Sequence, residues 1–228
     1  MDGFLLVDKP AGISSFGVVA RVRRILSEAA GVKVKVGHTG TLDPAATGLM
    51  ILVIGAYCKR AAEFSRMGKT YETELTLGVS SATGDVEGEM TQISTQQPHL
   101  EEIKAALSRF IGQIKQTPPA FSAIKINGQR AYKLARTGKE VKLEPREVTI
   151  YAITDVQYEY PKLTFTTSVS SGTYIRSLAE DIGKELGTGA YMSALKRIKI
   201  DNYEISKAVS LDNLNAEVIQ NKPKHLQK

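Results

Sequence analysis

The 228-residue sequence predicts an α+β fold with a mixed, mainly antiparallel central sheet flanked by helices. Most of its strand-like segments alternate apolar and polar residues, which is typical of strands that bury one face of a sheet. Segments with helical spacing are interleaved irregularly with these strands, without the regular alternation of a parallel α/β fold. The composition, 42% hydrophobic and 24% charged, is that of a folded protein with a substantial core.

In the first half of the chain, apolar residues recur at helical spacing after Ser14 and Ser15, which can cap a helix, and Gly31 is well placed to end it. A dense group of glycines and small polar residues predicts a loop between two strands. The elements expected here are a helix over 15–31, strands over 32–36 and 49–54 around a loop at 37–48, a strand over 70–77, and a polar connection over 78–98.

The second half contains stronger turn signals. Thr117-Pro118-Pro119 interrupts the chain, and Asn127-Gly128 predicts a tight hairpin. The elements expected are a helix over 100–111, strands over 147–158 and 163–169, a helix over 175–186, a strand over 194–201, a short helix from Ser210, and a frayed end at 221–228.

Several classes of protein do not fit the sequence. No apolar run approaches the roughly 18 residues of a membrane-spanning helix, and the N-terminus lacks the long apolar region of a signal peptide. The single cysteine, Cys58, excludes an internal disulfide framework and favours the reducing cytoplasm. We therefore expect a cytoplasmic protein with no membrane contact.

Common cofactor and metal motifs are also incomplete. Gly68-Lys69-Thr70 lacks the first glycine of a phosphate-binding loop, because that position holds Glu63. Gly187-Thr188-Gly189 lacks the third glycine of a dinucleotide fingerprint. The three histidines are far apart in the sequence, so we expect no zinc site.

The net charge of +6 is concentrated in one stretch. Between Lys125 and Arg146 there are seven basic residues and two acidic ones, spaced every few residues beside Tyr132. This pattern is typical of a surface that follows the phosphates of a nucleic acid, although an ordinary solvated face would give the same pattern.

The loop at 37–48 holds one carboxylate, Asp43, followed by Pro44. One interpretation is structural: Pro44 starts a helical turn and Asp43 caps it. The other is functional: Asp43 is held on a rigid loop whose small neighbours leave room for a substrate. Residue types alone do not choose between these interpretations.

The longer pattern resembles the TruB-type tRNA pseudouridine synthases, which share this motif with guide-RNA-dependent enzymes of the dyskerin type. The signature loop Gly-His-Thr-Gly-Thr-Leu-Asp-Pro-x-Ala-Thr-Gly spans residues 37–48, and further blocks follow the order of the family up to about residue 214. These blocks are Leu6-x-Asp-Lys-Pro-x-Gly-x-Ser-Ser15, Lys69-x-Tyr71 with Leu77-Gly78, Thr83-x-Asp-x-Glu-Gly88, Thr117-Pro-Pro119 through Ser122-Ala-x-Lys125 to Gly128, and Gly172-Thr-Tyr-Ile-Arg-Ser-Leu178.

The resemblance implies a pseudouridine synthase fold and an isomerase that needs no cofactor or metal. Its substrate would be uridine 55 in the T-arm loop of tRNA, which must be flipped out of the loop to be reached. By motif position, Asp43 is the catalytic carboxylate, acting as a nucleophile or as a base that abstracts a sugar proton. Arg176 would pair with that carboxylate through its guanidinium fork.

Three further residues are implied to contact the flipped base. Tyr71 matches the tyrosine that stacks on it, His38 matches the residue that occupies the vacated space, and Leu195 is a looser match to a residue that packs on the uracil. Without the motif, each has an ordinary interpretation, as a core aromatic, a loop histidine and a strand leucine.

The resemblance also implies a domain organisation. Residues 1–214 would form the catalytic domain, with an RNA-gripping insertion at about 115–147, and 215–228 would be a short tail without the PUA-like domain of many bacterial members. The RNA-binding residues expected in the insertion are Lys125, Arg130, Lys133 and Arg136. We expect tRNA as the partner of a monomer without an obligate protein partner. A guide-RNA-dependent synthase and a non-catalytic tRNA-binding or folding module are the alternatives.

Overall fold

The structure is a computed structural model that describes residues 2–122, 124–126, 128–131, 134 and 143–215. The chain divides into two compact units, Met1–Tyr71 with Leu195–Lys228, and Glu72–Ala194. Two strands, β4 (Lys69–Leu77) and β12 (Ala190–Ile200), each begin in one unit and end in the other. Within the described residues, no helix is long and apolar enough to cross a membrane.

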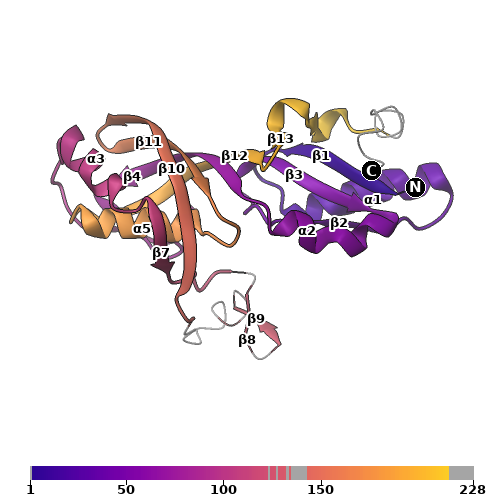
Figure 1. Cartoon of the computed structure of the whole chain (residues 1–228), viewed down its shortest axis with the longest axis horizontal. Coiled ribbons are helices and arrows are strands. Elements are labelled where there is room, and N and C mark those ends of the chain that lie inside the picture. Colours follow the sequence, from indigo (N-terminus) through magenta and orange to yellow (C-terminus); the bar gives the residue numbers. More distant parts are fainter. Residues whose placement is uncertain (1, 123, 127, 132–133, 135–142, 216–228) are drawn as a thin grey trace. The chain divides into compact units, whose positions relative to one another are not determined.

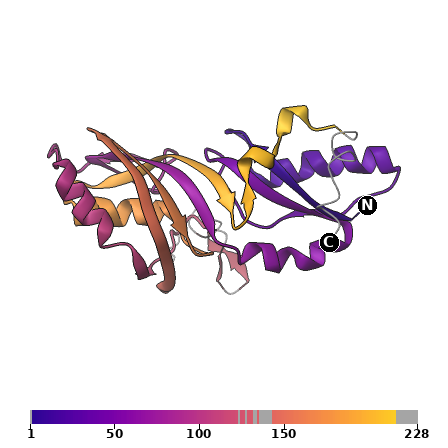
Figure 2. The same ribbon diagram turned by 45° about the horizontal axis from the view of Figure 1, so that its top comes forward.

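The first unit combines a sheet with helices on both of its faces (Figure 2). Its elements, besides the parts of β4 and β12, are β1 (Gly3–Lys9), α1 (Ser15–Ala30), β2 (Val36–His38), β3 (Thr47–Ile54), the 3₁₀ helix η1 (Gly55–Arg60), α2 (Ala61–Ser65), β13 (Tyr203–Glu204), η2 (Ile205–Lys207), β14 (Val209–Ser210) and η3 (Leu211–Asn213).

Strand β3 is the centre of this sheet. It pairs antiparallel with β1 along its whole length, from Gly3 opposite Ile54 to Lys9 opposite Gly48. On its other side, β2 pairs antiparallel with its end and β12 pairs parallel with its beginning. The final seven residues of β3 are all buried, because both faces of the sheet are covered.

The two faces are buried by different helices. Phe4 and Leu6 of β1 and alternate residues of β3 pack against Phe64 of α2 in an apolar cluster. The side chains of β1 and β3 that alternate with these point to the opposite face, where α1 lies with Val18 and Val22 fully buried (Figure 2). This double packing gives the first unit a rigid frame next to the loop that follows β2.

The second unit holds the remaining strands of the ten-stranded sheet, in the order β12, β4, β11, β10, β7, with α3 in contact with β10 and α5 (Figure 1). Its remaining elements are β5 (Val79–Ser81), β6 (Met90–Gln92), α3 (Leu100–Ser108), β7 (Gly112–Gln116), β8 (Lys125–Ile126), β9 (Gln129–Arg130), β10 (Arg146–Glu159), β11 (Lys162–Val169) and α5 (Ile175–Glu185).

The predicted fold class is confirmed, since the structure is α+β with a mixed sheet. The first helix is also confirmed: Ser14 caps α1 by accepting a hydrogen bond from the Gly17 amide, and Gly31 ends it in the left-handed conformation at φ 66°. The hairpin around Asn127-Gly128 is present as β8 and β9, with residue 127 itself outside the described residues.

Three predicted boundaries are wrong. The strand expected at 32–36 begins at Val36, because its partner β3 ends opposite it at Ile54. The polar connection at 78–98 contains the hairpin of β5 and β6, whose strands of three residues each are too short to give an alternation signal. The helix expected from Ser210 is the single 3₁₀ turn η3, preceded by β14.

Candidate active site

Asp43 lies on the loop at 39–46, between β2 and β3 of the first unit. Its carbonyl oxygen accepts a hydrogen bond from the Ala46 amide at 3.1 Å, which closes a turn around Pro44, and no helix follows. The interpretation of Asp43 as a helix cap is therefore wrong. Its side chain is half-buried, so the loop holds the carboxylate without enclosing it.

The loop is tied to the elements around it through buried side chains. The Ser15 hydroxyl, at the start of α1, donates to the Leu42 carbonyl and accepts from the Leu42 amide, both at 2.8 Å. The Thr39 amide and hydroxyl both donate to the Ile51 carbonyl of β3, each at 3.2 Å. These bonds fix the main chain that leads up to Asp43, and the Ser15 and Thr39 side chains that make them are buried.

Arg197 of β12 lies under the same loop with only 1% of its surface exposed. Its Nε donates to the Leu49 carbonyl at 2.7 Å and its Nη2 donates to the Gly40 carbonyl at 3.2 Å. The two acceptors stand on opposite sides of the loop, so one guanidinium connects both ends. Buried charges normally require compensation, and here main-chain dipoles provide it.

Lys9 supports the loop from β1 and is fully buried. Its Nζ donates to the carbonyls of Pro10 at 2.8 Å and Pro44 at 3.1 Å. Burial lowers the pKa of Lys9 to about 8; the negative charge of Asp43 opposes this shift, and the positive charge of Arg197 adds to it. The Asp43 carboxylate therefore lies in the positive field of a buried lysine, which favours its ionised form.

Gly48 ends the signature loop for a steric reason. It lies opposite Arg197 in the parallel pairing of β3 with β12, at φ 104°. A Cβ at this position would lie 2.3 Å from the Arg197 carbonyl oxygen and 2.7 Å from its amide nitrogen. Only glycine allows the two backbones to approach this closely.

The other residues expected around the base in the first unit occupy three elements. His38 is the last residue of β2 and is half-buried. Tyr71 is on the buried face of β4 with 8% of its surface exposed. Leu195 of β12 is half-buried, and its carbonyl accepts a hydrogen bond from the Thr47 hydroxyl at 3.5 Å, next to the Asp43 loop. The unit thus contains Asp43, His38, Tyr71 and Leu195, and their roles toward a base stay predictions.

Lys69, two residues before Tyr71, is a second buried lysine. Its Nζ donates to the carbonyls of Ser65, at 2.7 Å, and Met67. Burial lowers its pKa to about 8, and the charge of Arg197 contributes to this shift. The beginning of β4 is therefore anchored to the end of α2 by a cation that exchanges its proton more readily than an exposed lysine.

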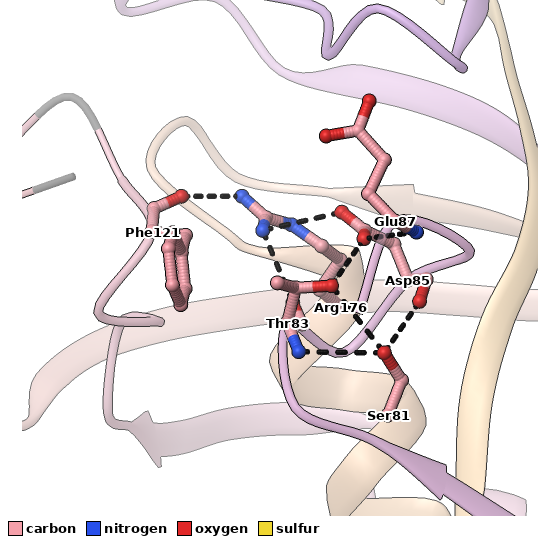
Figure 3. A network of polar contacts seen from close by, with 6 residues as sticks. All are labelled: Ser81, Thr83, Asp85, Glu87, Phe121 and Arg176. Carbon is pink, nitrogen blue, oxygen red and sulfur yellow. Dashed lines mark hydrogen bonds and ion pairs between the residues drawn. The ribbon is translucent and has the colours of Figure 1, made fainter. Parts of the chain in front are cut away.

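Arg176 belongs to the second unit, on the first turn of α5, with 6% of its surface exposed. Its Nη1 lies 3.3 Å from the Asp85 carboxylate and donates to the Thr83 carbonyl at 3.1 Å (Figure 3). Its Nη2 donates to the Phe121 carbonyl at 2.8 Å. The guanidinium thus joins the loop after β5 to the beginning of the proposed RNA-gripping insertion.

Asp85 orders its own loop. Its carboxylate accepts hydrogen bonds from the Thr83 hydroxyl at 2.5 Å and the Glu87 amide at 3.1 Å (Figure 3). The Ser81 hydroxyl donates to its carbonyl at 2.5 Å. Asp85 is therefore a structural partner of Arg176 in the second unit. The expected pairing of Arg176 with Asp43 stays a prediction.

The beginning of the proposed insertion is tied to the beginning of α5. The side-chain amide of Gln116, which is 1% exposed, donates to the Tyr174 carbonyl at 3.0 Å and accepts from the Tyr174 amide at 2.8 Å. The Ser177 hydroxyl donates to the Thr117 carbonyl at 2.8 Å. These bonds fix both ends of the arginine motif against residues 116–121.

The RNA-binding residues expected in the insertion are described only in part. Lys125 and Arg130 face each other in the register of β8 and β9. Lys133 and Arg136 lie outside the described residues. In the part of the chain that the structure describes, no three His, Cys, Asp or Glu residues are grouped as a metal site.

Sequence reasoning missed Arg197 and Gln116. A Lys-Arg pair on a strand gives the pattern of an exposed edge, and a single glutamine gives no periodic signal, so nothing in the local sequence distinguishes these buried residues. For Ser15 the sequence indicated only a possible helix cap, whereas Ser14 is the cap and Ser15 binds the catalytic loop.

Two family models match the chain along most of its length. Residues 23–175 match the N-terminal domain of the TruB family pseudouridylate synthases, and residues 176–228 match the C-terminal domain of tRNA pseudouridylate synthase B. The protein named tRNA pseudouridine synthase B of Dechloromonas aromatica (strain RCB) is 45% identical over 94% of this chain and 70% of its own length. The protein of the same name from Aquifex aeolicus (strain VF5) is 44% identical over 93% of this chain and 73% of its own length.

Two solved structures of multicomponent complexes contain a chain with a similar fold. The chain matches one from a Cbf5-Nop10-Gar1 complex with a TM-score of 0.72 and 28% identity, over 93% of this chain and 53% of the other. It also matches a chain from an H/ACA RNP bound to a substrate RNA containing 2′-deoxyuridine. That match has a TM-score of 0.68 and 26% identity, over 93% of this chain and 52% of the other. The chain thus spans about half the length of these two solved chains.

Proposed function

Because this chain belongs to the TruB family of pseudouridylate synthases, we propose that it is an isomerase that converts uridine 55 in the T-arm loop of tRNA to pseudouridine. The relatives named tRNA pseudouridine synthase B, which cover more than nine-tenths of the chain, support tRNA as the substrate. The observation that carries the proposal is the position of Asp43: a half-buried carboxylate on a loop that buried Ser15, Lys9 and Arg197 hold in place.

The reaction rearranges one bond and conserves all atoms of the nucleoside. The glycosidic bond between N1 and C1′ breaks, the uracil turns, and C5 bonds to the same C1′. C5 then loses its hydrogen and N1 takes up a proton. In this scheme Asp43 acts either as a nucleophile or as the base that removes a sugar proton, and both roles require its ionised form.

The remaining residues bind and orient the flipped base. Tyr71 offers its ring for stacking, since aromatic faces hold extruded bases without hydrogen bonds. His38 occupies the space that the base vacates, and Leu195 packs on the uracil. Arg176 pairs with Asp43 during the reaction and links this pair to the insertion through its bond to the Phe121 carbonyl.

We further propose that residues 1–214 act as one catalytic domain in which the segment at about 115–147 grips the T loop. Tyr174, Arg176 and Ser177 bond to residues 116–121, which supports a mechanical link between the insertion and the arginine motif. The protein is proposed to work in the cytoplasm as a monomer without an obligate protein partner.

The similarity to chains from Cbf5-containing complexes favours a second candidate, an enzyme that depends on a guide RNA. The identity to these chains is 26–28%, against 44–45% to the tRNA enzymes, so the stand-alone reaction is the better supported proposal. Activity of the purified chain on bare tRNA separates the two, because a guide-dependent enzyme would be inactive there.

The test is incubation of the purified chain with unmodified tRNA, followed by mapping of pseudouridine at nucleotide resolution. We expect one modified position in the T loop. Asp43→Asn should abolish the product while leaving tRNA binding within about twofold, since it removes a charge but little volume. The matched control is Asp212→Asn, whose side chain is 79% exposed. Equal activity of Asp43→Asn and the native chain would refute the catalytic role, and an unmodified T loop would refute the substrate.

A further inference from the structure

A group of basic residues lies along α1 and the beginning of β2, outside the catalytic loop and the insertion. It consists of Arg23 on α1, Lys33 and Lys35 just before β2, and Lys59 on η1, with Phe16 at the start of α1. We call it the α1–β2 strip. Nothing in the reaction described above uses these five residues.

Hydrogen bonds place the basic members of the strip next to one another. The Arg23 guanidinium donates to the Val36 carbonyl at 3.4 Å, so it reaches the residue that follows Lys35. The Lys35 carbonyl accepts from the Gly55 amide at 2.8 Å and from the Cys58 thiol at 3.8 Å, and Cys58 precedes Lys59. The main chains that carry these cations thus adjoin one another at the edge strand β2, with α1 on one side and η1 on the other.

The strip carries an excess of positive charge. Lys33, Lys35 and Lys59 are exposed, and within the described residues neither they nor Arg23 form an ion pair with a carboxylate. Other surface arginines of the same unit do have acidic partners: Arg21 pairs with Asp212, and Arg60 pairs with Glu63. Two acidic residues lie nearby, Glu28 on α1 and Asp2, whose carboxylate binds the Ala56 amide.

Phe16 adds an aromatic surface to these charges. Its ring is 65% exposed, and the Arg23 guanidinium lies 5.8 Å from the ring centroid. An exposed aromatic ring beside a guanidinium is a platform on which nucleic acid bases and sugars pack.

The strip begins at the catalytic loop. Phe16 follows Ser15, whose hydroxyl is bonded to Leu42, the neighbour of Asp43. Lys35 directly precedes β2, and β2 ends at His38. In an extended chain the three residues from Lys35 to His38 span about 10 Å. Phe16 is therefore the member of the strip beside the Asp43 loop, and the lysines lie toward the opposite end of β2, so RNA that continues from Asp43 along α1 and β2 would cover them.

We propose that the α1–β2 strip binds the phosphate backbone of the substrate RNA next to the target uridine, and that Phe16 packs on a flanking nucleotide. This inference rests on the proposed tRNA substrate and adds a second contact surface to it, independent of the insertion. The contacts are to phosphates and a stacking face, so they position the RNA without reading its sequence.

The test compares two triple variants with the same loss of charge. The strip variant is Lys33→Gln, Lys35→Gln and Lys59→Gln. The control variant is Lys104→Gln, Lys162→Gln and Lys199→Gln, which removes three surface lysines that each have an acidic partner. Both are made in the Asp43→Asn background, and their Kd for unmodified tRNA is measured at several salt concentrations, so the readout does not depend on turnover.

We expect the strip variant to raise Kd by about tenfold or more at 0.1 M salt and to reduce the slope of log Kd against log salt by roughly 2. The control variant should keep the native slope. Phe16→Ala should raise Kd about fivefold or more and leave the slope unaltered, since stacking releases no counterions. Thermal unfolding of each variant shows whether the fold is intact.

Equal slopes for the strip and control variants would overturn the inference. So would a strip variant that binds anionic lipid vesicles more weakly than the native chain does but binds tRNA with the same Kd. A failure of the proposed function looks different: the native chain would form no pseudouridine, whatever the slopes are. In the catalytically competent background, the strip variant should raise KM for tRNA more than it lowers kcat, whereas a folding defect would lower kcat and the unfolding temperature together.

Discussion

Replacing Arg197 with methionine removes the buried guanidinium under the Asp43 loop while keeping a side chain of similar length. The Leu49 and Gly40 carbonyls lose charged donors at 2.7 and 3.2 Å. Hydrogen bonds to charged groups contribute about 1.5–3 kcal/mol each, so the gross loss is roughly 3–6 kcal/mol. The variant no longer buries a charge, so the desolvation cost disappears and part of the lost stability is regained. We expect the free energy of unfolding to fall by about 2–4 kcal/mol.

The same change should reduce catalysis, because the loop loses the residue that connects its two sides. A displacement of a reacting group by about 1 Å costs on the order of 100-fold in rate, so we expect kcat to fall by roughly 10- to 100-fold. Urea unfolding and single-turnover pseudouridine formation measure the two effects. Arg197→Lys should recover part of both, since an ammonium reaches only one of the two carbonyls.

The control for this prediction is Lys199→Met, on the same strand but with 45% of its side chain exposed. It should change the free energy of unfolding by less than about 0.5 kcal/mol. If Arg197→Met matched this control in both stability and kcat, the guanidinium would not hold the loop and our account of the site would be wrong.

Three further predictions concern the frame of the site. Gly48→Ala should lower the unfolding temperature sharply and abolish activity, because its Cβ would lie 2.3 Å from a backbone oxygen; circular dichroism during heating checks this. Asp85→Asn should destabilise the chain by about 3–5 kcal/mol in urea, since it breaks a buried ion pair to the Arg176 guanidinium. Lys9 and Lys69 have a pKa of about 8 in the fold and 10.5 in the unfolded chain, so between these pH values the unfolded state binds more protons and stability rises with pH. The free energy of unfolding should increase by about 1–2 kcal/mol per lysine from pH 8 to 9.5, and Lys69→Met should remove its share.

The sequence predicts the elements of this fold where local chemistry decides them. Ser14 and Gly31 bound α1 as expected, because caps act within one turn of the chain. The hairpin of β5 and β6 is different: each strand has only three residues, and only the ladder between Val79 and Gln92 reveals it. Pairing between segments that show no alternation depends on contacts that a one-dimensional pattern does not contain.

For the site, the sequence predicts which residues do the chemistry but not what holds them. Asp43 stands out through the length of its motif, whereas the interpretation as a helix cap followed a general preference of Asp-Pro that the turn at Ala46 overrides. Arg197 was missed because a buried arginine on a strand has no periodic signature. Its function follows only from two main-chain acceptors, which the fold brings together from residues 40 and 49.

The buried cations lead to a prediction about pH that a purely structural role would not give. Lys9 binds the carbonyl of Pro44, the residue after Asp43, and its charge interacts with the Asp43 carboxylate. When RNA covers the site and excludes water, this positive field favours the ionised carboxylate that either reaction route needs.

We therefore expect Lys9→Met to move the acidic limb of the pH profile of kcat/KM toward higher pH, because losing a nearby positive charge makes Asp43 take up its proton more readily. Lys9→Arg, which keeps the charge, should leave the limb in place even if it lowers the rate. If Lys9 only anchors the main chain, both variants would lower the rate at all pH values without moving the limb. A limb that shifts with the charge at position 9 and not with the unfolding temperature would show that the lysine acts on the carboxylate through its field.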